Sequence, residues 1–435
     1  MSQTTKELID VSIILPSYNV EKYIEECLQS VCNNDNIEII CIDAGSTDKT
    51  LDLIEMYENK DSRIKIVNSQ KKSYGYQVNV GIKLARGKYI QIVETDDYII
   101  PGALRDLVNL AEKYNLDYIK GDYYGFVDVE SERIFKEYKM PEFINDSQIC
   151  NIVITPSKHC EVYLRDTSIW RGIYRKEFLL KNEIQLNETT GAAFQDIGFV
   201  LQTIELAKRA MYVDVFFYCY RQNRVGASSI NPNCIRYTYQ EFKYLNDILL
   251  LSKGIAMREV HSFLSESKKV INTIENHIEE YDWLCNDIKL KIHDGLLTKE
   301  DFDKKTWEDV NKAIFHTDQY ISSCENENDR IEKNKRCILN NLKNKNVVIF
   351  GCGILGLEAV EELIRNKISI IALIDNNPEK WNKRIAGITV CSPQNIVQKN
   401  RNARYLISNK KNTEEIKMQL IQMGVNERNI LFFWR

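Results

Sequence analysis

Short apolar runs alternate with segments of helical periodicity over residues 11–120. The runs are continuous, as in strands that are buried on both faces of a parallel sheet. Strands are therefore predicted at Val11–Leu15, Ile37–Asp43, Ile64–Asn68, Tyr89–Val93 and from Asp117, and helices at Glu21–Cys32, Thr47–Asn59, Tyr76–Ala85 and Pro101–Tyr114. This order predicts right-handed crossovers and a mostly parallel sheet, which makes the fold class α/β.

The pattern changes twice further along the chain. Residues 125–232 are less regular, and from about Ile235 to Asn340 apolar residues recur at helical spacing, with a loop predicted at Ser322–Asn328. An α/β pattern then returns, with strands at Asn346–Gly351, Ile368–Asp375, Arg404–Ser408 and Asn429–Phe433, and helices at Leu355–Asn366 and Thr413–Met423. We therefore divide the chain into a domain at residues 1–232, a helical connector at 233–340 and an accessory domain at 341–435.

Composition and charge exclude several classes of protein. The chain has 435 residues, too many for one typical core, and its 44% apolar and 28% charged residues are typical of soluble globular proteins. Its net charge of −4 gives no general electrostatic reason to bind nucleic acid. No signal peptide or membrane-spanning stretch is visible, and the 12 cysteines are scattered without a Cys-x-x-Cys pair. These features predict a cytoplasmic protein.

Acidic clusters end two of the predicted strands. Asp43 closes one strand and precedes Ser46, and a second cluster at residues 94–97 follows another strand. Ligands of parallel sheets bind outside the carboxyl ends of the strands, so both clusters are expected in one crevice. Their hard oxygen atoms suit Mg²⁺ or Mn²⁺, and such a cation suits a phosphate-bearing substrate. The alternatives are simple N-capping at residues 46–48 and a solvated acidic turn at residues 94–97.

The first predicted strand ends in residues that break its regularity. Pro16 and Asn19 interrupt the strand and leave Tyr18 exposed at the sheet edge. An exposed aromatic ring at this place could stack on a planar base. A plain strand-to-helix turn is the alternative interpretation.

Residues 11 to about 230 resemble family-two glycosyltransferases, which have the GT-A fold. The resemblance rests on Pro16-Ser17-Tyr18-Asn19, Asp43-Ala44-Gly45-Ser46-Thr47-Asp48, Ala85-Arg86-Gly87-Lys88-Tyr89-Ile90, Glu94-Thr95-Asp96-Asp97 with Pro101, Ile169-Trp170-Arg171-Gly172-Ile173-Tyr174-Arg175, Gln195-Asp196, and Tyr218-Cys219-Tyr220-Arg221-Gln222. Three positions depart from the family pattern. Ala44 replaces a second acid, Glu94 replaces the first Asp of the metal cluster, and Gln77-Val78-Asn79 replaces the common Ala-Arg-Asn segment.

The resemblance implies roles for the residues at these positions. Asp96 and Glu94 are implied ligands of Mg²⁺ or Mn²⁺, and Asp196 is the implied catalytic base, with Gln195 in place of the family's Glu. Donor contacts are implied for Pro16, Tyr18, Asn19, Asp43, Ser46, Asp97, Arg221 and Arg224, and acceptor contacts for Trp170 and Gln195. A solvated surface stays open as the alternative for the two arginines, and core packing for the tryptophan.

Glycines follow the first strand of the C-terminal segment. Gly351, Gly353 and Gly356 open a helix and Asp375 ends the next strand, which is the spacing of a dinucleotide-binding fingerprint. The segment resembles small Rossmann-like domains that are appended to sugar-modifying enzymes. Because it is only about half of a full dinucleotide fold, we favour a packing or oligomerisation role over nucleotide binding.

These features predict a metal-dependent inverting glycosyltransferase. It would move a sugar from a nucleoside-diphosphate donor to a glycan or lipid-linked acceptor in cell-surface polysaccharide synthesis. The chemistry agrees, because a single displacement needs a carboxylate to take the proton of the acceptor hydroxyl. Two alternatives stay open: a nucleotidyltransferase, and a nucleotide-binding sensor or scaffold that acts through the C-terminal domain. Peripheral association with the inner face of the membrane and homo-oligomerisation stay open as well.

Overall fold

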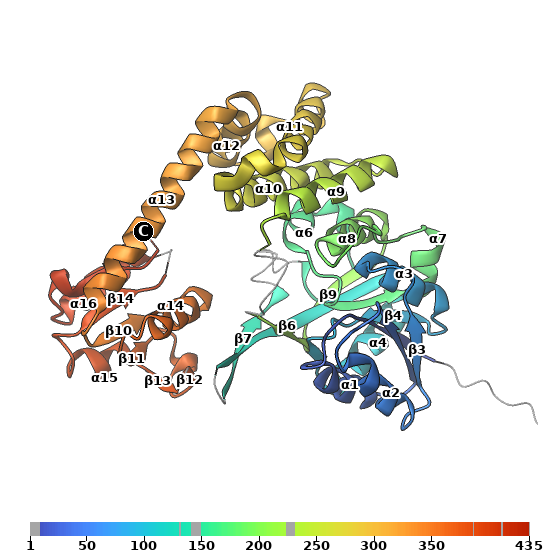
Figure 1. Cartoon of the computed structure of the whole chain (residues 1–435), viewed down its shortest axis with the longest axis horizontal. Coiled ribbons are helices and arrows are strands. Elements are labelled where there is room, and N and C mark those ends of the chain that lie inside the picture. The colour runs from blue at the N-terminus through green and yellow to red at the C-terminus, as the bar shows by residue number, and fades with distance from the viewer. Residues whose placement is uncertain are drawn as a thin grey trace, which may run out of the picture. The chain divides into compact units, whose positions relative to one another are not determined.

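A computed structural model of the chain describes residues 9–129, 132–140, 149–222, 231–385, 387–409 and 412–434. The described residues form two compact units (Figure 1). The first unit comprises Met1–Gly125 and Glu137–Ile321, and the second comprises Phe126–Lys136 and Ser322–Arg435. The larger sheet lies in the first unit apart from the stretch 126–136, which belongs to the second unit, and the smaller sheet lies in the second unit.

The sheet of the first unit is mixed. Its strand order is β3-β2-β1-β4-β8-β6-β9-β5, with β7 paired to β6. The strands are β1 Val11–Ser17, β2 Ile37–Asp43, β3 Ile64–Asn68, β4 Tyr89–Ile92, β5 Tyr98–Ile99, β6 Tyr118–Val129, β7 Glu132–Tyr138, β8 Gly172–Arg175 and β9 Ala210–Arg221. Strands β1 to β4 pair in parallel, whereas β8 is antiparallel to β4 and to β6. The predicted parallel order therefore holds for the first four strands, and β8 reverses direction at the centre of the sheet.

Burial explains why the first strands read as continuous apolar runs. All residues of β1 and of β2 are buried, as expected for central parallel strands that are covered on both faces. Helix α3 (Tyr74–Leu84) packs on both of these strands. The remaining helices of this segment are α1 Ile24–Cys32, α2 Thr50–Glu58 and α4 Ala103–Tyr114. The carboxyl ends of β1, β2 and β4 are thus held at one edge of the sheet.

Helices complete the first unit. They include α6 Cys160–Arg165, α7 Lys176–Lys181, α8 Gln195–Leu206, α9 Cys234–Asp247, α10 Lys253–Lys269, α11 Ile278–His293 and α12 Lys304–Phe315. Helix α9 packs against α8 and α10, and α10 packs against α6. A buried ion cluster joins this bundle, in which Lys291 pairs with Glu259 and lies 2.6 Å from Asp287. The helices after residue 232 are therefore in direct contact with helices of the preceding segment.

One sequence prediction in this region is wrong. The polar stretch Ser322–Asn328, predicted as a loop, lies inside the continuous helix α13 (Thr317–Leu342). The helix contains no glycine or proline, and polar side chains alone do not interrupt a solvent-exposed helix.

The second unit contains a smaller sheet with the order β12-β13-β11-β10-β14-β15. Its strands are β10 Val347–Phe350, β11 Ile370–Ile374, β12 Arg384–Ile385, β13 Ile388–Cys391, β14 Arg404–Ile407 and β15 Ile430–Phe432, and its helices include α14 Ile354–Arg365, α15 Pro393–Val397 and α16 Thr413–Gln422. All the pairings are parallel except that of β12 with β13. The sequence predicted four of these strands and missed β12 and β13, which are short.

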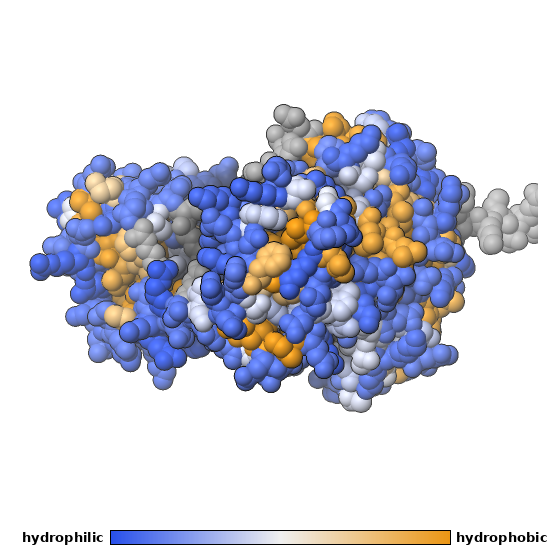
Figure 2. Space-filling view, turned by 90° about the horizontal axis from the view of Figure 1, so that it is seen from above, coloured by the Kyte–Doolittle hydropathy of each residue, from blue (hydrophilic) through white to orange (hydrophobic). Residues whose placement is uncertain are grey.

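Apolar side chains at the surface are scattered among polar ones. On the face shown in Figure 2, orange patches are separated by hydrophilic residues. Within the described residues, no helix is both long enough and apolar enough to cross a bilayer.

Candidate active site

The loops after β1 and β2 are joined by hydrogen bonds. Both carboxylate oxygens of Asp43 are used, since Oδ2 accepts from the N–H groups of Gly45 (2.8 Å) and Ser46 (2.9 Å), and Oδ1 accepts from Ser46 Oγ (2.5 Å). Asn19 donates its N–H to Ser46 Oγ (3.0 Å), and its Oδ1 accepts from the N–H of Thr47 (2.8 Å). The structure thus brings together three residues that the sequence assigned to donor binding, and their polar atoms shape the turn itself.

The end of β1 also contacts the turn after β4. Thr95 Oγ1 donates to the carbonyl oxygen of Pro16 (3.0 Å), which ties the two strand ends together. The side chain of Tyr18 is 43% exposed. Lys72 Nζ lies 4.8 Å from the centre of its ring and 3.1 Å from its hydroxyl oxygen. A solvent-facing aromatic ring beside a cation therefore stands at the edge of the sheet.

Asp97 anchors the acidic turn that follows β4. The residue is 1% exposed, and its carboxylate accepts hydrogen bonds from the N–H of Arg221 (2.7 Å) and the hydroxyl of Tyr218 (2.9 Å). Burial, together with the charges of Asp96 and Glu94, holds the pKa of Asp97 well above its usual range. Asp97 therefore links the turn to β9 from inside the protein.

The other two acids of the turn are only half-buried. Glu94 Oε1 accepts a hydrogen bond from the hydroxyl of Tyr74 (2.5 Å), at the start of α3. The carbonyl oxygen of Asp96 accepts from Arg221 Nε (2.9 Å), and Arg221 also pairs with Glu26 (2.9 Å). Arg221 thus braces the acidic turn. Arg224, the second arginine assigned to the donor, lies outside the described residues.

Asp196 stands at the start of helix α8. Its Oδ1 accepts a hydrogen bond from the N–H of Ile197 (3.1 Å), and the side chain remains half-buried. Burial raises the pKa of Asp196 to about 6, against the opposing effect of its backbone hydrogen bonds and of the cations Arg258 and Lys120. A carboxylate with this pKa is ionised at neutral pH and is a stronger base than an ordinary aspartate.

The residues just before Asp196 are held in a strained loop. Phe194 has a φ of 66°, a left-handed conformation that is uncommon for a bulky residue. Gln195 is 2% exposed, and its amide bonds to Thr189, Gly191 and Ala193 at 2.7 to 3.2 Å. Gln195 therefore closes the loop that presents Asp196, and its predicted contact with an acceptor stays a prediction.

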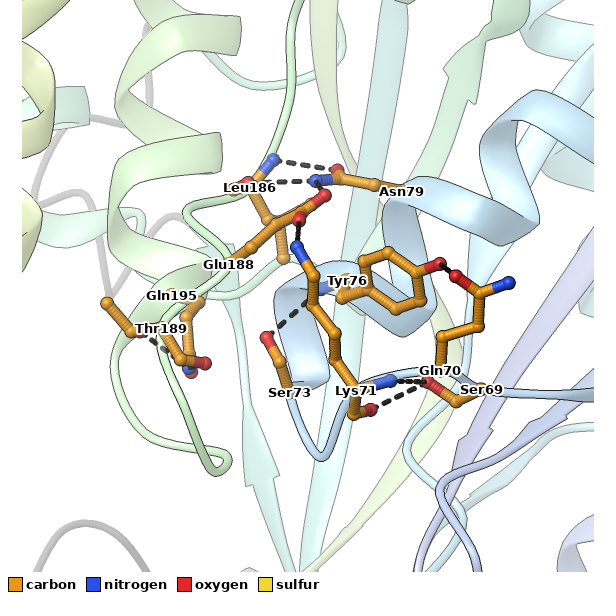
Figure 3. A network of polar contacts seen from close by, with 10 residues as sticks. All are labelled: Ser69, Gln70, Lys71, Ser73, Tyr76, Asn79, Leu186, Glu188, Thr189 and Gln195. Carbon is orange, nitrogen blue, oxygen red and sulfur yellow. Dashed lines mark hydrogen bonds and ion pairs between the residues drawn. The ribbon is translucent and has the colours of Figure 1, made fainter.

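We call residues 185–195 the strap, because this segment makes contacts with both α3 and α9; Figure 3 shows its contacts on the α3 side. On the α3 side, Asn79 exchanges two hydrogen bonds of 2.9 Å with the backbone of Leu186, and Lys71 pairs with Glu188 at 2.6 Å. Gly75 allows this approach, since a Cβ atom there would overlap the carbonyl oxygen of Asn187. The glycine fixes how closely the strap lies on α3.

On the other side, α9 holds the strap near both of its ends. Asn187 Nδ2 donates to the carbonyl oxygen of Gln240 (3.2 Å), and Tyr244 donates its hydroxyl to the carbonyl of Gln185 (3.3 Å). The ring of Phe194 packs edge-on against Tyr237 at 5.9 Å. Asp196 therefore follows a segment that is fixed from two directions.

Trp170 lies in an aromatic cluster. It is 8% exposed and stacks on Tyr218 and Tyr220 at centroid distances of 4.5 and 5.1 Å, with the ring of Tyr123 edge-on at 4.9 Å. Tyr218 is the residue that also hydrogen-bonds Asp97. Tyr218 thus links the aromatic cluster to the acidic turn. A role for Trp170 in binding the acceptor stays a prediction.

The glycine-rich turn of the second unit is internally satisfied. Asp375 Oδ2 accepts from the N–H of Cys352 (2.8 Å) and from Lys380 Nζ (2.9 Å), and its Oδ1 accepts from the N–H of Asn377 (2.9 Å). A Cβ atom on Gly356 would overlap the carbonyl oxygen of Gly351, whereas nothing lies within 4 Å of one on Gly353. Two of the three glycines therefore serve close packing, with Gly351 at a φ of 102°.

Several residues of the site were not found from the sequence. Tyr74 joins Glu94 to α3, and Arg258 on α10 acts on the charge of Asp196. Gln77, which the sequence analysis noted only as part of a departure from the family pattern, donates to the carbonyl oxygens of Ser17 (3.0 Å) and Ile42 (2.5 Å), and so joins the ends of β1 and β2. Their partners are distant in sequence, and no local motif signals such contacts.

The mixed α/β fold of the first unit is that of a glycosyltransferase with the GT-A fold. A profile described as Glycosyl transferase family 2 matches residues 12–169, and one described as C2185-like, N-terminal matches residues 343–431. An uncharacterized glycosyltransferase of Haemophilus influenzae is 32% identical over 278 residues, which cover 61% of this chain and 84% of that protein. The chain belongs to glycosyltransferase family 2.

Other relatives are also named glycosyltransferases, but they match this chain over different lengths. The uncharacterized glycosyltransferase EpsJ of Bacillus subtilis is 32% identical over 216 residues, covering 49% of this chain and 61% of EpsJ. Glycosyltransferase GlyG of Streptococcus pneumoniae is 24% identical over 297 residues, covering 64% of this chain and 95% of GlyG. The crystal structure of S. aureus TarS 1-349 in complex with UDP-GlcNAc has a TM-score of 0.47 and 22% identity, covering 64% of this chain and 83% of that one.

Proposed function

We propose that the first unit transfers a sugar from a nucleoside-diphosphate donor to a hydroxyl of a glycan or lipid-linked acceptor, with inversion at the anomeric carbon. The proposal includes a role in cell-surface polysaccharide synthesis, at the inner face of the membrane. Relatives named as poly(ribitol-phosphate) β-glucosyltransferase and β-N-acetylglucosaminyltransferase support this class of acceptor. Their identity to this chain is 29% and 28%, so the sugar and the polymer are not carried over.

One juxtaposition carries the proposal. The hydroxyl of Tyr74 lies 2.5 Å from Glu94, and burial together with the charges of Glu94 and Asp196 raises the pKa of Tyr74 well above its usual range. Tyr74 therefore stands near both the acidic turn after β4 and the carboxylate at the start of α8. A site with a diphosphate at the first and an acceptor hydroxyl at the second has the arrangement that a single displacement needs.

Glu94 and Asp96 fit a divalent cation that is shared with a diphosphate. Among the residues that the structure describes, no three His, Cys, Asp or Glu side chains converge on a metal position. Mg²⁺ is usually held by one or two carboxylates and completes its octahedral shell with water and substrate phosphate oxygens, so this pair is sufficient. When bound, such a cation would neutralise charge that develops on the departing diphosphate.

The protein's own residues account for the remaining steps. Tyr18 offers its exposed ring to a planar base, while the hydrogen-bonded turn at Asp43 and Ser46 shapes the wall beside it. The acceptor hydroxyl gives its proton to Asp196 while its oxygen bonds to the anomeric carbon. The bond from that carbon to the diphosphate oxygen breaks in the same step, so the sugar is inverted.

Release of nucleoside diphosphate from a panel of donor sugars, with acceptor glycans, tests the proposal. Turnover should need Mg²⁺ or Mn²⁺, stop on chelation and return when the metal is restored. NMR of the product should show the anomeric configuration opposite to that of the donor. Turnover that is insensitive to chelation would remove the metal from the mechanism, and a retained configuration would remove the single displacement.

For the second unit we propose a packing or oligomerisation role. The support is that the oxygens of Asp375 already accept hydrogen bonds from its own turn and from Lys380. Calorimetry of the full chain with NAD, NADP and donor sugars tests this, with Gly353→Val as the control. Heat that this variant abolishes would instead establish a nucleotide site.

A further inference from the structure

Helix α9 places a second carboxyl group beside the start of α8. Glu241 is 1% exposed, and its Oε1 accepts a hydrogen bond from Asn187 Nδ2 in the strap (3.0 Å). Its Oε2 lies over the first turn of α8, since a Cβ atom built on Gly198 would be 2.5 Å from it. Within the described residues, no side chain donates a hydrogen bond to Oε2. Glu241 therefore touches the segments on both sides of Asp196.

The surroundings of the two acids are unequal. Asp196 is half-buried, and the positive charges of Arg258 on α10 and Lys120 on β6 favour its ionised form. The charge of Asp196 also acts on Tyr74 on α3 and on Tyr174 on β8. No cation is among the groups that act on Glu241, which is influenced by Asp196, Asn187 and the backbone of Gly198 in the described structure, and which itself acts on Tyr244.

Ionisation of Glu241 is costly, because its side chain is buried and the negative charge of Asp196 acts on it. Burial, together with the charge of Asp196, raises the pKa of Glu241 to about 8. At neutral pH the proton therefore resides on Glu241 and the negative charge on Asp196. The glycine at position 198 leaves the space that the neutral carboxyl group occupies.

We propose that Glu241 is a positioning residue of the transferase site: its buried carboxyl group holds the strap through Asn187 and lies against Gly198 in the first turn of α8, and it thereby fixes the place of Asp196. The inference rests on the function proposed above. It lies outside the matched family segment, because α9 begins at Cys234 and the profile ends at residue 169. Its consequence is that the bundle takes part in transfer.

Glu241→Gln and Glu241→Ala separate position from charge. The glutamine keeps a neutral group and an acceptor for Asn187, so kcat near pH 7 should stay within about threefold of the unmodified protein. The alanine removes both, so kcat should fall about 10- to 100-fold from misplacement of the base, with the KM for donor unchanged. Glu280→Gln is the matched control and should have no effect. Glu280 lies on α11 and pairs with Arg236, which lies on α9 together with Glu241.

The pH profile of kcat is the readout that a purely structural role would not change. As pH rises through about 8, ionisation of Glu241 beside Asp196 should lower kcat in the unmodified protein, and Glu241→Gln should abolish this alkaline decline. Gly198→Ala, whose new methyl group displaces the carboxyl group, should resemble Glu241→Ala and covers the case in which the alanine variant fails to fold.

The outcomes distinguish the two proposals. If the unmodified protein shows no transfer at all, the proposed function fails. If the unmodified protein is active and Asp196→Asn is inactive, the proposed function stands. In that case, an alkaline decline that persists in Glu241→Gln, or a full kcat in Gly198→Ala, overturns only the role of Glu241. If the Glu241 variants lose thermal stability but keep the pH profile of kcat of the unmodified protein, Glu241 is a core residue only.

Discussion

The two sheets of this protein both end in acids at the carboxyl edge of parallel strands, but they treat these acids differently. In the second unit, Asp375 is 8% exposed, and both of its oxygens accept hydrogen bonds from the backbone of its own unit, from Cys352 and Asn377. In the first unit, Asp96 and Asp196 remain half-buried at the edge of the site. A motif thus marks the edge of a sheet, while exposure and hydrogen bonding show which acids can act on a ligand.

The same contrast exists inside the first unit. Asp43 and Asp97 are 2% and 1% exposed and accept hydrogen bonds that hold their turns, whereas Asp96, which precedes Asp97, is half-buried. A cluster of acids in a sequence therefore divides into residues that build the site and residues that face it. The substitutions below test that division, from the largest expected effect to the smallest.

The carboxylate at the start of α8 should show the largest effect. Asp196→Asn removes the proton acceptor but keeps the size and the helix position of the side chain. We expect kcat to fall about 1,000-fold or more, with donor affinity nearly unchanged, as measured by product formation and by calorimetry. Asp375→Asn is the matched control, and near-normal kcat in the first variant would assign the base elsewhere.

Asp96→Ala should come next. Loss of this half-buried carboxylate should lower transfer about 100-fold or more and remove the metal dependence of donor binding. Calorimetry of donor with and without Mn²⁺ measures it, and the exposed Asp106 on α4, changed to Ala, is the control. Donor binding that still responds to the metal would exclude Asp96 from the metal site.

Gly75→Ala tests whether the close approach of α3 to the strap matters. The added Cβ would overlap the carbonyl oxygen of Asn187, so the strap must shift and carry Asp196 with it. We expect about a tenfold or greater loss of kcat and a lower Tm. Gly353→Ala, where the added atom meets nothing within 4 Å, should leave both values unchanged. Equal behaviour of the two variants would contradict this account of the strap.

The pH dependence follows from the raised pKa of Asp196, which is about 6. Below that value the carboxyl group is protonated and cannot accept the proton of the acceptor hydroxyl. The rate should therefore fall up to about tenfold for each pH unit below 6 and level off above it until the alkaline decline begins. A profile that stays flat down to pH 4.5 would show that the base titrates elsewhere.

The smallest effect should come from the second unit. Asp375→Asn weakens the hydrogen bonds from Cys352 and Asn377 and removes the ion pair with Lys380. We expect a decrease of about 1–3 kcal/mol in the free energy of unfolding of this unit and no change in kcat. A loss of transfer in a folded variant would show that the two sheets depend on each other.

The sequence predicted the bounds of strands well where an apolar run is closed by polar residues. Strands β2 and β3 lie at the predicted residues, because their apolar runs end at polar or charged residues. The resemblance also led to Asp96 and Asp196. Tyr74, Arg258 and Glu241 could not be found in this way, since each belongs to an ordinary amphipathic helix and acts on a residue brought near only by the tertiary fold.

One strand that the sequence analysis missed and one loop that it predicted wrongly show the limits of local patterns. The reversal at β8 (Gly172–Arg175) depends on pairing with β4 and β6, neither of which is adjacent in sequence. Helix α13 continues through a polar stretch because no glycine or proline stops it. The pairing of β8 therefore lies outside the window of a local pattern, whereas the continuity of α13 follows from the residue types within that window.

The attachment of the strap to both α3 and α9 limits how such a chain can be recombined in evolution. A natural junction between the family segment and a new C-terminal partner would fall in the interval after β9, which ends at Arg221, and before α9. Exchange there would separate Asp196 from α9, the helix that holds one side of the strap before Asp196. Viable hybrids should therefore inherit α8, α9 and α10 as one block, and change partners only beyond Ile321, where the first compact unit ends.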